Sequence, residues 1–190
     1  MINKSESTAV ILCGGLSTRM KTPKYKLFLD SIIPNLTGFN NIALSVRDEH
    51  QITDSKFTLW PDCVENCGPL GGILTALKMS ASKFIFVTSC DVPGISANFI
   101  DELYFNLNES DNCLIPVLNG KIQPLTGIYN KSCIKEIESA INANIFSVKK
   151  FLANIDVHYL YLDNNYKNFL VNLNTPDDYR NWLLNKEILS

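Results

Sequence analysis

The sequence has few of the residues and segments that would place it in several common protein classes. Only 2 of its 190 residues are histidine, and its formal net charge is −2. A nearly neutral chain is not expected to bind nucleic acid or an anionic membrane through its overall charge. The apolar run near the N-terminus stops at Gly14-Gly15, and it is too short for a signal-peptide core or a membrane span. We therefore expect a cytoplasmic protein that binds neither nucleic acid nor membranes.

The six cysteines also give no sign of a metal site or a disulfide framework. Cys63 and Cys67 are the only closely spaced pair, and a zinc site would need a second pair or several histidines. Four of the six lie in or beside apolar runs, where a thiol behaves as a small apolar side chain. Reduced, structural cysteines are the interpretation that fits a cytoplasmic protein.

What the chain does have is a regular alternation of apolar runs and helix-like segments. With 46% hydrophobic and 19% charged residues, it can bury the core of one domain. The alternation predicts an α/β fold with a mainly parallel sheet. Strands are expected over residues 9–13, 42–47, 57–60, 84–88, 113–118, 125–129 and 157–162, and helices over 70–79, 98–107, 132–142, 147–152 and from 175 onward. A hairpin at Asn119-Gly120 would make 113–118 and 125–129 an antiparallel edge, which suits Pro116.

The most informative stretch is residues 8–27, in which a buried strand runs into a glycine pair and then into cations. Gly14 and Gly15 let backbone N–H groups approach an anion, and Arg19 and Lys24 supply positive charge in the same place. This layout predicts a phosphate-binding loop. Neither the Walker pattern G-x-x-x-x-G-K-[ST] nor the dinucleotide pattern G-x-G-x-x-G is present. The alternative is an ordinary strand and turn with cations on the surface.

A second marked segment covers residues 62–75. Gly68-Pro69 is a turn that delivers a helix N-terminus, and Gly71-Gly72 follows at positions where another group can approach the backbone. Asp62 precedes this turn by a few residues. The alternatives are that Gly71-Gly72 only allows tight packing of the helix, and that Asp62 is a solvated loop acid.

A third candidate is Asp91, which directly follows the strongest apolar strand. Open α/β sheets bind their ligands at the carboxyl ends of parallel strands. Mg²⁺ prefers one or two carboxylates together with phosphate oxygens and water, so Asp91 can hold a magnesium ion that bridges the phosphates of a nucleoside triphosphate. The alternative is that Asp91 caps the next helix, but Pro93 and Ser96 predict that this helix starts later.

A fourth segment lies near the C-terminus, where Asn172 and Asn174 precede Thr175-Pro176-Asp177-Asp178. This string has an N-cap residue, a proline at the first helical position and acids in the first turn. It therefore predicts a well-capped last helix, whatever the two asparagines do.

Together these segments resemble the molybdenum cofactor guanylyltransferases, which are nucleotidyltransferases related to the sugar-phosphate transferases. The similarity extends from about residue 8 to about residue 182. The resemblance implies a single-domain, Rossmann-like three-layer fold with a mainly parallel sheet and an antiparallel edge. It also implies a GTP half at about 8–110 and an acceptor half at about 111–190. The motifs that carry it are Leu12-Cys13-Gly14-Gly15 with Arg19 and Lys24, Gly68-Pro69-Leu70, Asp91-Val92-Pro93, and Asn172-Leu173-Asn174-Thr175-Pro176.

The activity implied by this resemblance is transfer of GMP from GTP to molybdopterin, with Mg²⁺ as cofactor and pyrophosphate as the second product. Arg19, Lys24 and Asp91 would be catalytic, with Asp91 as the metal ligand. Asp62 would recognise guanine, and Asn172 and Asn174 would bind the acceptor. The acceptor phosphate is already an anion, so no general base is required, in agreement with the scarcity of histidine. Proteins that deliver or receive the cofactor are further implied partners. The implied nucleotide-binding residues are Leu12, Cys13, Gly14, Gly15, Lys24, Asp62, Gly68, Pro69 and Asp91.

The sequence also departs from the family pattern. Lys21 and Pro23 replace a glycine and an aspartate. The segment between Lys24 and Arg47 is shorter than in the family, and Pro34 and Gly38 interrupt its helical pattern. Ser45 is the nearest polar residue to the place of a guanosine-binding asparagine. These departures leave two alternatives open: a related cytidylyl- or sugar-phosphate nucleotidyltransferase, and a non-catalytic nucleotide-binding homologue.

Overall fold

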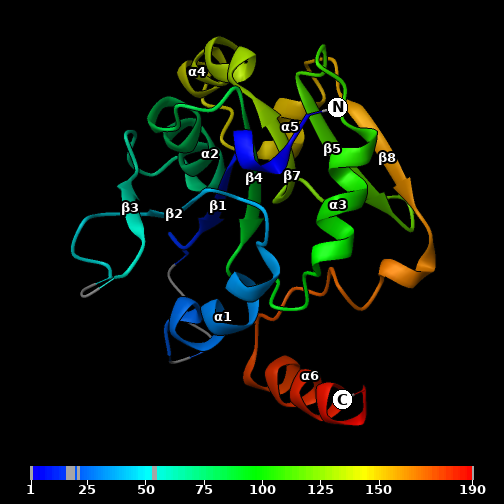
Figure 1. Cartoon of the computed structure of the whole chain (residues 1–190). Coiled ribbons are helices and arrows are strands. Elements are labelled where there is room, and N and C mark those ends of the chain that lie inside the picture. The colour runs from blue at the N-terminus through cyan, green and yellow to red at the C-terminus, as the bar shows by residue number, and fades with distance from the viewer. Residues whose placement is uncertain (1, 16–19, 21, 53–54, 190) are drawn as a thin grey trace.

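The computed structural model describes residues 2–15, 20, 22–52 and 55–189. Its strands form an eight-stranded sheet in the order β3-β2-β1-β4-β7-β5-β6, with β8 paired to β5 (Figure 1). Strands β1 to β4 run parallel, whereas β7 runs antiparallel to both β4 and β5. The predicted fold class, mainly parallel with an antiparallel part, is confirmed. The strands are β1 (Thr8–Leu12), β2 (Asn41–Val46), β3 (Thr58–Pro61), β4 (Phe84–Ser89), β5 (Cys113–Leu118), β6 (Lys121–Ile122), β7 (Thr126–Asn130) and β8 (His158–Leu162).

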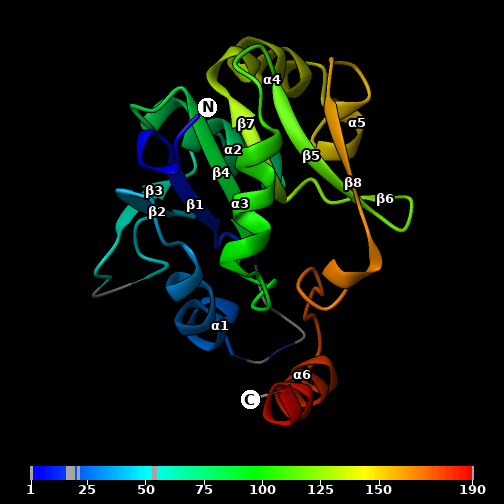
Figure 2. The ribbon, with the colours of Figure 1, turned by 45° about the vertical axis from the view of Figure 1, so that its right-hand side comes forward.

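Helices cover both faces of the sheet, which gives the predicted three layers (Figures 1 and 2). One core layer buries Phe28 of α1 and Phe99 of α3 against the sheet. The other buries Leu74 of α2, Ile137 of α4 and Phe151 of α5. Because both faces are covered, the central strands consist mostly of apolar residues, and this is what made them visible in the sequence. The α-helices are α1 (Lys24–Ile32), α2 (Gly68–Met79), α3 (Ala97–Asn106), α4 (Ile134–Asn142), α5 (Val148–Leu152) and α6 (Pro176–Leu189), and the 3-10 helices are η1 (Lys4–Glu6), η2 (Ile33–Asn35), η3 (Lys131–Cys133) and η4 (Asn164–Tyr166).

The sequence pattern missed one α-helix and one strand, besides short 3-10 helices. Helix α1 begins at Lys24 and ends at Ile32, before the interruption at Pro34 takes effect. Strand β6 pairs with β5 across Asn119 and Gly120, whose φ angles are +50° and +69°. Positive φ at both positions suits a two-residue hairpin turn, so the hairpin expected at this site joins β5 to β6 rather than directly to β7.

The expectation that Pro116 lies on an edge strand is wrong, because β5 has neighbours on both sides. On one side, β5 pairs with β7 at residues 113–114 and with β6 at residues 117–118, and β8 pairs along the other side. Pro116 falls between the β7 and β6 ladders, and its carbonyl accepts a hydrogen bond from the Gln123 N–H (2.8 Å). Its missing N–H therefore lies at a break between two ladders, which is where a sheet tolerates proline.

Helix α6 lies apart from the sheet and packs against α1 (Figure 2). The rings of Tyr179 and Trp182 meet Phe28 edge-on, with centroids 5.4 and 6.4 Å away. The predicted cap is confirmed, since Thr175 Oγ1 accepts from the Asp178 N–H (3.1 Å) and the Asp178 carboxylate accepts from the Thr175 N–H (2.8 Å). Hydrogen bonds from the Asn174 N–H and from Thr175 hold the pKa of Asp178 below its ordinary value. None of the described helices is both long and apolar enough to cross a membrane.

Candidate active site

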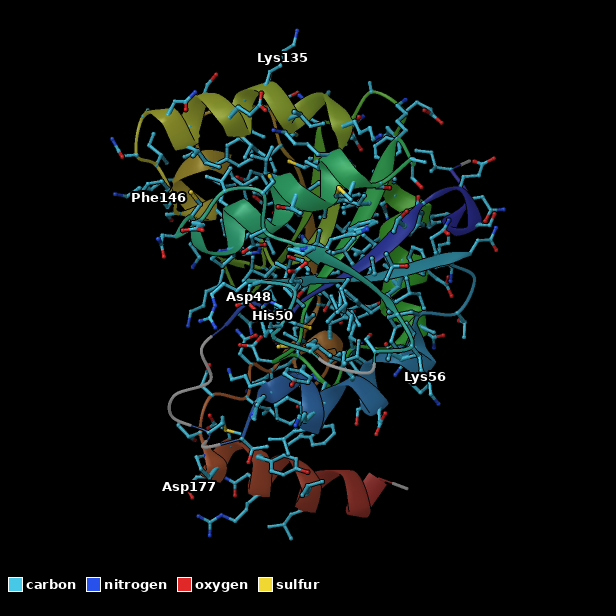
Figure 3. All side chains as sticks on the ribbon, turned by 90° about the vertical axis from the view of Figure 1, so that its left-hand side faces the viewer. Asp48, His50, Lys56, Lys135, Phe146 and Asp177 are labelled. Carbon is cyan, nitrogen blue, oxygen red and sulfur yellow. The ribbon has the colours of Figure 1, made fainter. Side chains whose placement is uncertain are left out.

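The carboxyl ends of the four parallel strands meet at one edge of the sheet. The register sets Leu12 of β1 beside Ser45 of β2 and beside Ser89 of β4. The segments that follow these strands therefore lie together, at the edge where open α/β sheets bind ligands. They contain the glycine pair after β1, the loop after β2, Asp62 after β3 and Asp91 after β4. Labels for Asp48 and His50 mark the loop after β2 in Figure 3.

Three of the predicted site residues form a cluster that we call the lysine cluster: Lys24, Asp91 and Asn174. The Lys24 Nζ lies 3.2 Å from Asp91 Oδ2 and donates a hydrogen bond to Asn174 Oδ1 (2.8 Å). The Lys24 and Asp91 side chains are 14% and 21% exposed. The main chain adds a tie, because the Leu173 N–H donates to the Asp91 carbonyl (2.8 Å). The fold thus brings the start of α1, the end of β4 and the segment before α6 to one point.

Two other predicted residues are placed differently. The side chain of Asn172 is exposed, and the hydrogen bond to Lys24 that the structure describes comes from Asn174. Arg19 lies outside the residues that the structure describes, as does Lys21. The predicted catalytic role of Arg19 therefore stays a prediction from the sequence.

The glycine pair after β1 is not explained by packing. Among the described residues, a Cβ on Gly14 would come no closer than 3.7 Å to Asp62 Oδ2 or to the Arg47 N, which is ordinary contact, and a Cβ on Gly15 would meet nothing within 4 Å. The described part of the fold would therefore accommodate alanine at both positions. What glycine provides here is an uncovered backbone, which is what a bound phosphate or nucleotide requires.

Leu12 and Cys13 were also predicted to bind the nucleotide. Both side chains are buried, one in each core layer, so only their main-chain groups are available to a ligand. The Cys13 thiol is hydrogen-bonded to the Cys90 thiol. This bond and the burial of the side chain hold the pKa of Cys13 well above its ordinary value. The thiol is therefore protonated at neutral pH and acts as a core residue.

A second group of residues forms what we call the Asp62 corner: Ser45, Asp62 and Gly72. Ser45 Oγ donates to Asp62 Oδ1 (3.2 Å), and the Asp62 N–H donates to the Val46 carbonyl (2.8 Å). Burial raises the pKa of the Asp62 carboxyl, and the hydrogen bond from Ser45 opposes part of that rise. The carboxylate also lies beside the position of a Cβ on Gly14. Asp62 is therefore a fixed group next to the glycine pair, not a solvated loop acid.

The glycines that open α2 have two different surroundings. A Cβ on Gly71 would lie 3.0 Å from the Cys67 Cβ, and one on Gly72 would lie 2.8 Å from Ser45 Oγ. Tight packing of the helix, the alternative stated above, accounts for both. Gly68 and Pro69 are exposed, and Gly68 has a φ of +57°, so the predicted turn into the helix is present.

Gln51, in the loop after β2, was missed by the sequence reasoning. Its Nε2 donates to the Cys13 carbonyl (2.5 Å) and its Oε1 accepts from the Arg47 N–H (2.7 Å). Its own carbonyl accepts from the hydroxyl of Tyr25 (3.2 Å), which follows Lys24 on α1. A glutamine in a polar loop carries no pattern that would reveal these contacts. These contacts follow from the pairing of β1 with β2, which brings Cys13 close to the loop after β2.

The family model and the similar curated proteins identify the same family. The sequence model described as the MobA-like NTP transferase domain matches residues 9–158. A probable molybdenum cofactor guanylyltransferase of Flavobacterium johnsoniae is 32% identical, over 90% of this chain and 93% of that protein. The protein of the same description from Clostridium perfringens is also 32% identical, over 99% of this chain and 100% of its own length. The resemblance stated from the sequence motifs is confirmed.

Solved structures of lower sequence identity confirm the fold. The molybdopterin-guanine dinucleotide biosynthesis protein A of Archaeoglobus fulgidus superposes with a TM-score of 0.80 at 22% identity, over 92% of this chain and 96% of that one. A 2-C-methyl-D-erythritol 4-phosphate cytidylyltransferase of Thermus thermophilus gives 0.67 at 8% identity, over 93% of this chain and 98% of that one. At these identities the likeness concerns the fold alone.

Proposed function

This chain belongs to the MobA-like NTP transferase family, and we propose that it transfers GMP from GTP to molybdopterin, with release of pyrophosphate. The observation that carries the proposal is the contact between Lys24, at the start of α1, and Asp91, just after the carboxyl end of β4. A cation and a carboxylate side by side, next to an uncovered glycine backbone, suit a ligand that brings both phosphates and a metal ion. The relatives named as molybdenum cofactor guanylyltransferases support the choice of substrates.

The reaction needs positioning and charge neutralisation more than proton transfer. An oxygen of the acceptor phosphate forms a bond to the α-phosphorus of GTP, and the bond from that phosphorus to the bridging oxygen breaks, so that pyrophosphate leaves. The acceptor phosphate is an anion at neutral pH, so no side chain has to remove a proton. The two histidines agree with this, because His50 is exposed and His158 is bound to Asp111.

Lys24 is placed to neutralise the negative charge of the triphosphate and of the departing pyrophosphate. It begins α1 and is held by Asp91 and Asn174, so its ammonium is already positioned before a ligand arrives. Preorganised charge of this kind is the largest contribution in many phosphoryl-transfer sites. Arg19 is proposed to assist on the basis of the family motif.

Asp91 is the proposed magnesium ligand. Among the described residues, no group of three or more His, Cys, Asp or Glu side chains could hold a metal ion by itself. A single carboxylate fits magnesium that arrives with the nucleotide, since phosphate oxygens and water complete its shell. When bound there, the ion would neutralise part of the phosphate charge and lower the cost of bringing two anions together.

Asp62 is proposed to select guanine. One carboxylate can accept hydrogen bonds from both the N1 and the N2 protons of that base. The hydrogen bond from Ser45 orients the carboxylate, and the bond from the Asp62 N–H to the Val46 carbonyl holds the main chain of this residue against β2. Gly14 and Gly15 would offer backbone N–H groups to the same nucleotide, with Gly68 and Pro69 alongside. Asn172 and Asn174 are proposed to bind the acceptor.

The test is a pyrophosphate-release assay with GTP, ATP, CTP and UTP in turn, each with and without molybdopterin and Mg²⁺. We expect release only with GTP, and only when both molybdopterin and Mg²⁺ are present. Preferred turnover of CTP would instead identify a cytidylyltransferase. Calorimetric binding of Mg-GTP without any release would identify a non-catalytic nucleotide-binding protein. Either result would overturn the proposal.

A further inference from the structure

The Gln51 side chain continues the sheet beyond the point where its main-chain ladder ends. The Cys13 N–H still bonds the Ser45 carbonyl (2.8 Å) in the ordinary manner of parallel strands. The next acceptor, the Cys13 carbonyl, is bonded by the Gln51 Nε2 instead. The Gln51 Oε1 accepts from the Arg47 N–H (2.7 Å), where β2 has just ended. A primary amide has the donor and acceptor of a peptide group, so this side chain replaces one rung of main chain.

The bond to the Cys13 carbonyl also fixes the direction of the Gly14 N–H. These two groups belong to one peptide unit, which is planar and trans, so the N–H points away from the side on which the carbonyl is held. Glycine adopts many φ values at little cost, and packing around Gly14 is open. Neither the glycine nor the described residues packed around it would therefore keep this peptide in one orientation. The contact from Gln51 does.

The same residue connects this peptide to the helix that carries Lys24. The Gln51 carbonyl accepts from the Tyr25 hydroxyl (3.2 Å), and Tyr25 is the second residue of α1. The Gln51 N–H donates to the Asp48 carbonyl (3.2 Å), which closes the loop on itself. One loop residue thus contacts the chain before the glycine pair, the end of β2 and the start of α1.

We propose that Gln51 is a positioning residue for nucleotide binding, which holds the Cys13–Gly14 peptide so that the Gly14 N–H is presented to GTP. This inference rests on the proposed function, because it assigns the glycine pair to the nucleotide. Gln51 does not have to touch the ligand. It removes the alternative orientation of the peptide in advance, and preorganisation of this kind increases affinity by lowering the cost of ordering on binding.

The test compares Gln51→Met with Gln51→Glu in the full-length protein. Methionine keeps the length of the side chain and removes both polar contacts, without adding charge. Glutamate keeps the acceptor for the Arg47 N–H but loses the donor to Cys13. We expect KM for GTP and its calorimetric Kd to rise roughly tenfold in both variants, as for a lost hydrogen bond with its partner left unsatisfied. The kcat at saturating GTP should stay within about threefold, because binding of ground and transition states is weakened alike.

Gln123→Met is the matched control, because the one hydrogen bond described for the Gln123 side chain runs from its Nε2 to the nearby Lys121 carbonyl (3.4 Å). Gln123 lies in the other half of the sheet, and its main-chain bonds to Pro116 and Thr126 do not depend on the side chain. This variant should leave the affinity for GTP unchanged. Thermal unfolding shows whether each variant folds, and Gln51→Glu keeps the test available if Gln51→Met does not. Wild-type affinity for GTP in both Gln51 variants would overturn the inference. A wild-type protein that neither binds nor turns over GTP would overturn the proposed function instead.

Discussion

The lysine cluster and the Asp62 corner lie at the same edge of the sheet, but they are built differently. Lys24, Asp91 and Asn174 come from three separate segments, are partly exposed, and are held by polar contacts. The Asp62 corner is close-packed: Ser45 is 2% exposed, and a Cβ on Gly72 would lie 2.8 Å from its hydroxyl. We therefore expect that the cluster can change with little effect on folding, whereas a change in the corner would affect both stability and the proposed recognition of guanine.

The largest effect is expected from Asp91→Asn in the lysine cluster. This variant loses the carboxylate that is proposed to hold magnesium and that positions Lys24. We expect kcat/KM for pyrophosphate release to fall about 10²-fold or more, as when one preorganised stabiliser is removed. The melting temperature should stay close to that of the wild type.

Asp101→Asn is the control for this variant. Asp101 lies on α3 and pairs with Lys4 on the outside of the molecule, so its removal should leave turnover unchanged. Activity of Asp91→Asn within a few-fold of the wild type would mean that the lysine cluster is not where the phosphates and the metal bind.

Substituting alanine for Gly72 and for Gly14 compares a close-packed glycine with one that has room for a methyl group. Gly72→Ala places a methyl group against Ser45 and should lower the free energy of unfolding by about 1–3 kcal/mol, as overpacking does. Gly14→Ala has room for its methyl group and should change stability by less than about 0.5 kcal/mol. It should nevertheless weaken the binding of GTP, because the methyl group would lie where the nucleotide is proposed to approach the backbone.

Urea denaturation gives the two stabilities, and calorimetry gives the two affinities. If Gly14→Ala proved as destabilising as Gly72→Ala, both glycines would serve packing. The open backbone after β1 would then no longer indicate a ligand.

Asp62→Asn is expected to lower the preference for GTP over ATP about tenfold. An amide offers one acceptor where the carboxylate offers two, and loss of a two-bond contact to a base edge costs roughly 1–3 kcal/mol of discrimination. The ratio of kcat/KM for GTP to that for ATP, measured by pyrophosphate release, should fall accordingly. An unchanged ratio would leave Asp62 as a structural residue.

The same variant should be more stable than the wild type at neutral pH. Burial raises the pKa of Asp62, so ionisation of this carboxyl is less favourable in the folded chain than in the unfolded one. The stability linked to this group is fully present below its ordinary pKa and is lost as pH rises through the raised value. Asparagine does not ionise, so Asp62→Asn should melt higher at pH 7, and the difference should shrink toward about pH 3. A lower melting temperature at pH 7 would contradict this sign.

The elements and the fold class could be predicted from the sequence because the central strands are buried on both faces and read as apolar runs. Helix α1 could not, since Pro34 disturbs the helical pattern although the helix ends before it at Ile32. Pro116 was misplaced because a break between two ladders within a sheet looks like an edge when only the sequence is visible.

The site could be predicted in part for a similar reason. Motifs with fixed spacing identified Lys24, Asp62 and Asp91, but spacing gives no information about which of them meet. The contact of Asn174 with Lys24 spans 150 residues of sequence, and that of Gln51 with Cys13 spans 38. Both depend on strand order, which no local pattern contains.

The smallest effect, and the one that separates the two asparagines, is expected from Asn174→Ala. Asn174 accepts from the Lys24 ammonium in a partly buried setting, and a bond of this kind contributes about 1 kcal/mol. We expect kcat/KM for GTP to fall about fivefold, because Lys24 is less well positioned. Asn172→Ala leaves Lys24 in place and should change only KM for molybdopterin. Steady-state kinetics with one substrate varied at a time distinguishes these outcomes. If Asn172→Ala and Asn174→Ala lowered kcat/KM for GTP equally, the bond between Asn174 and Lys24 would not be the cause of the loss.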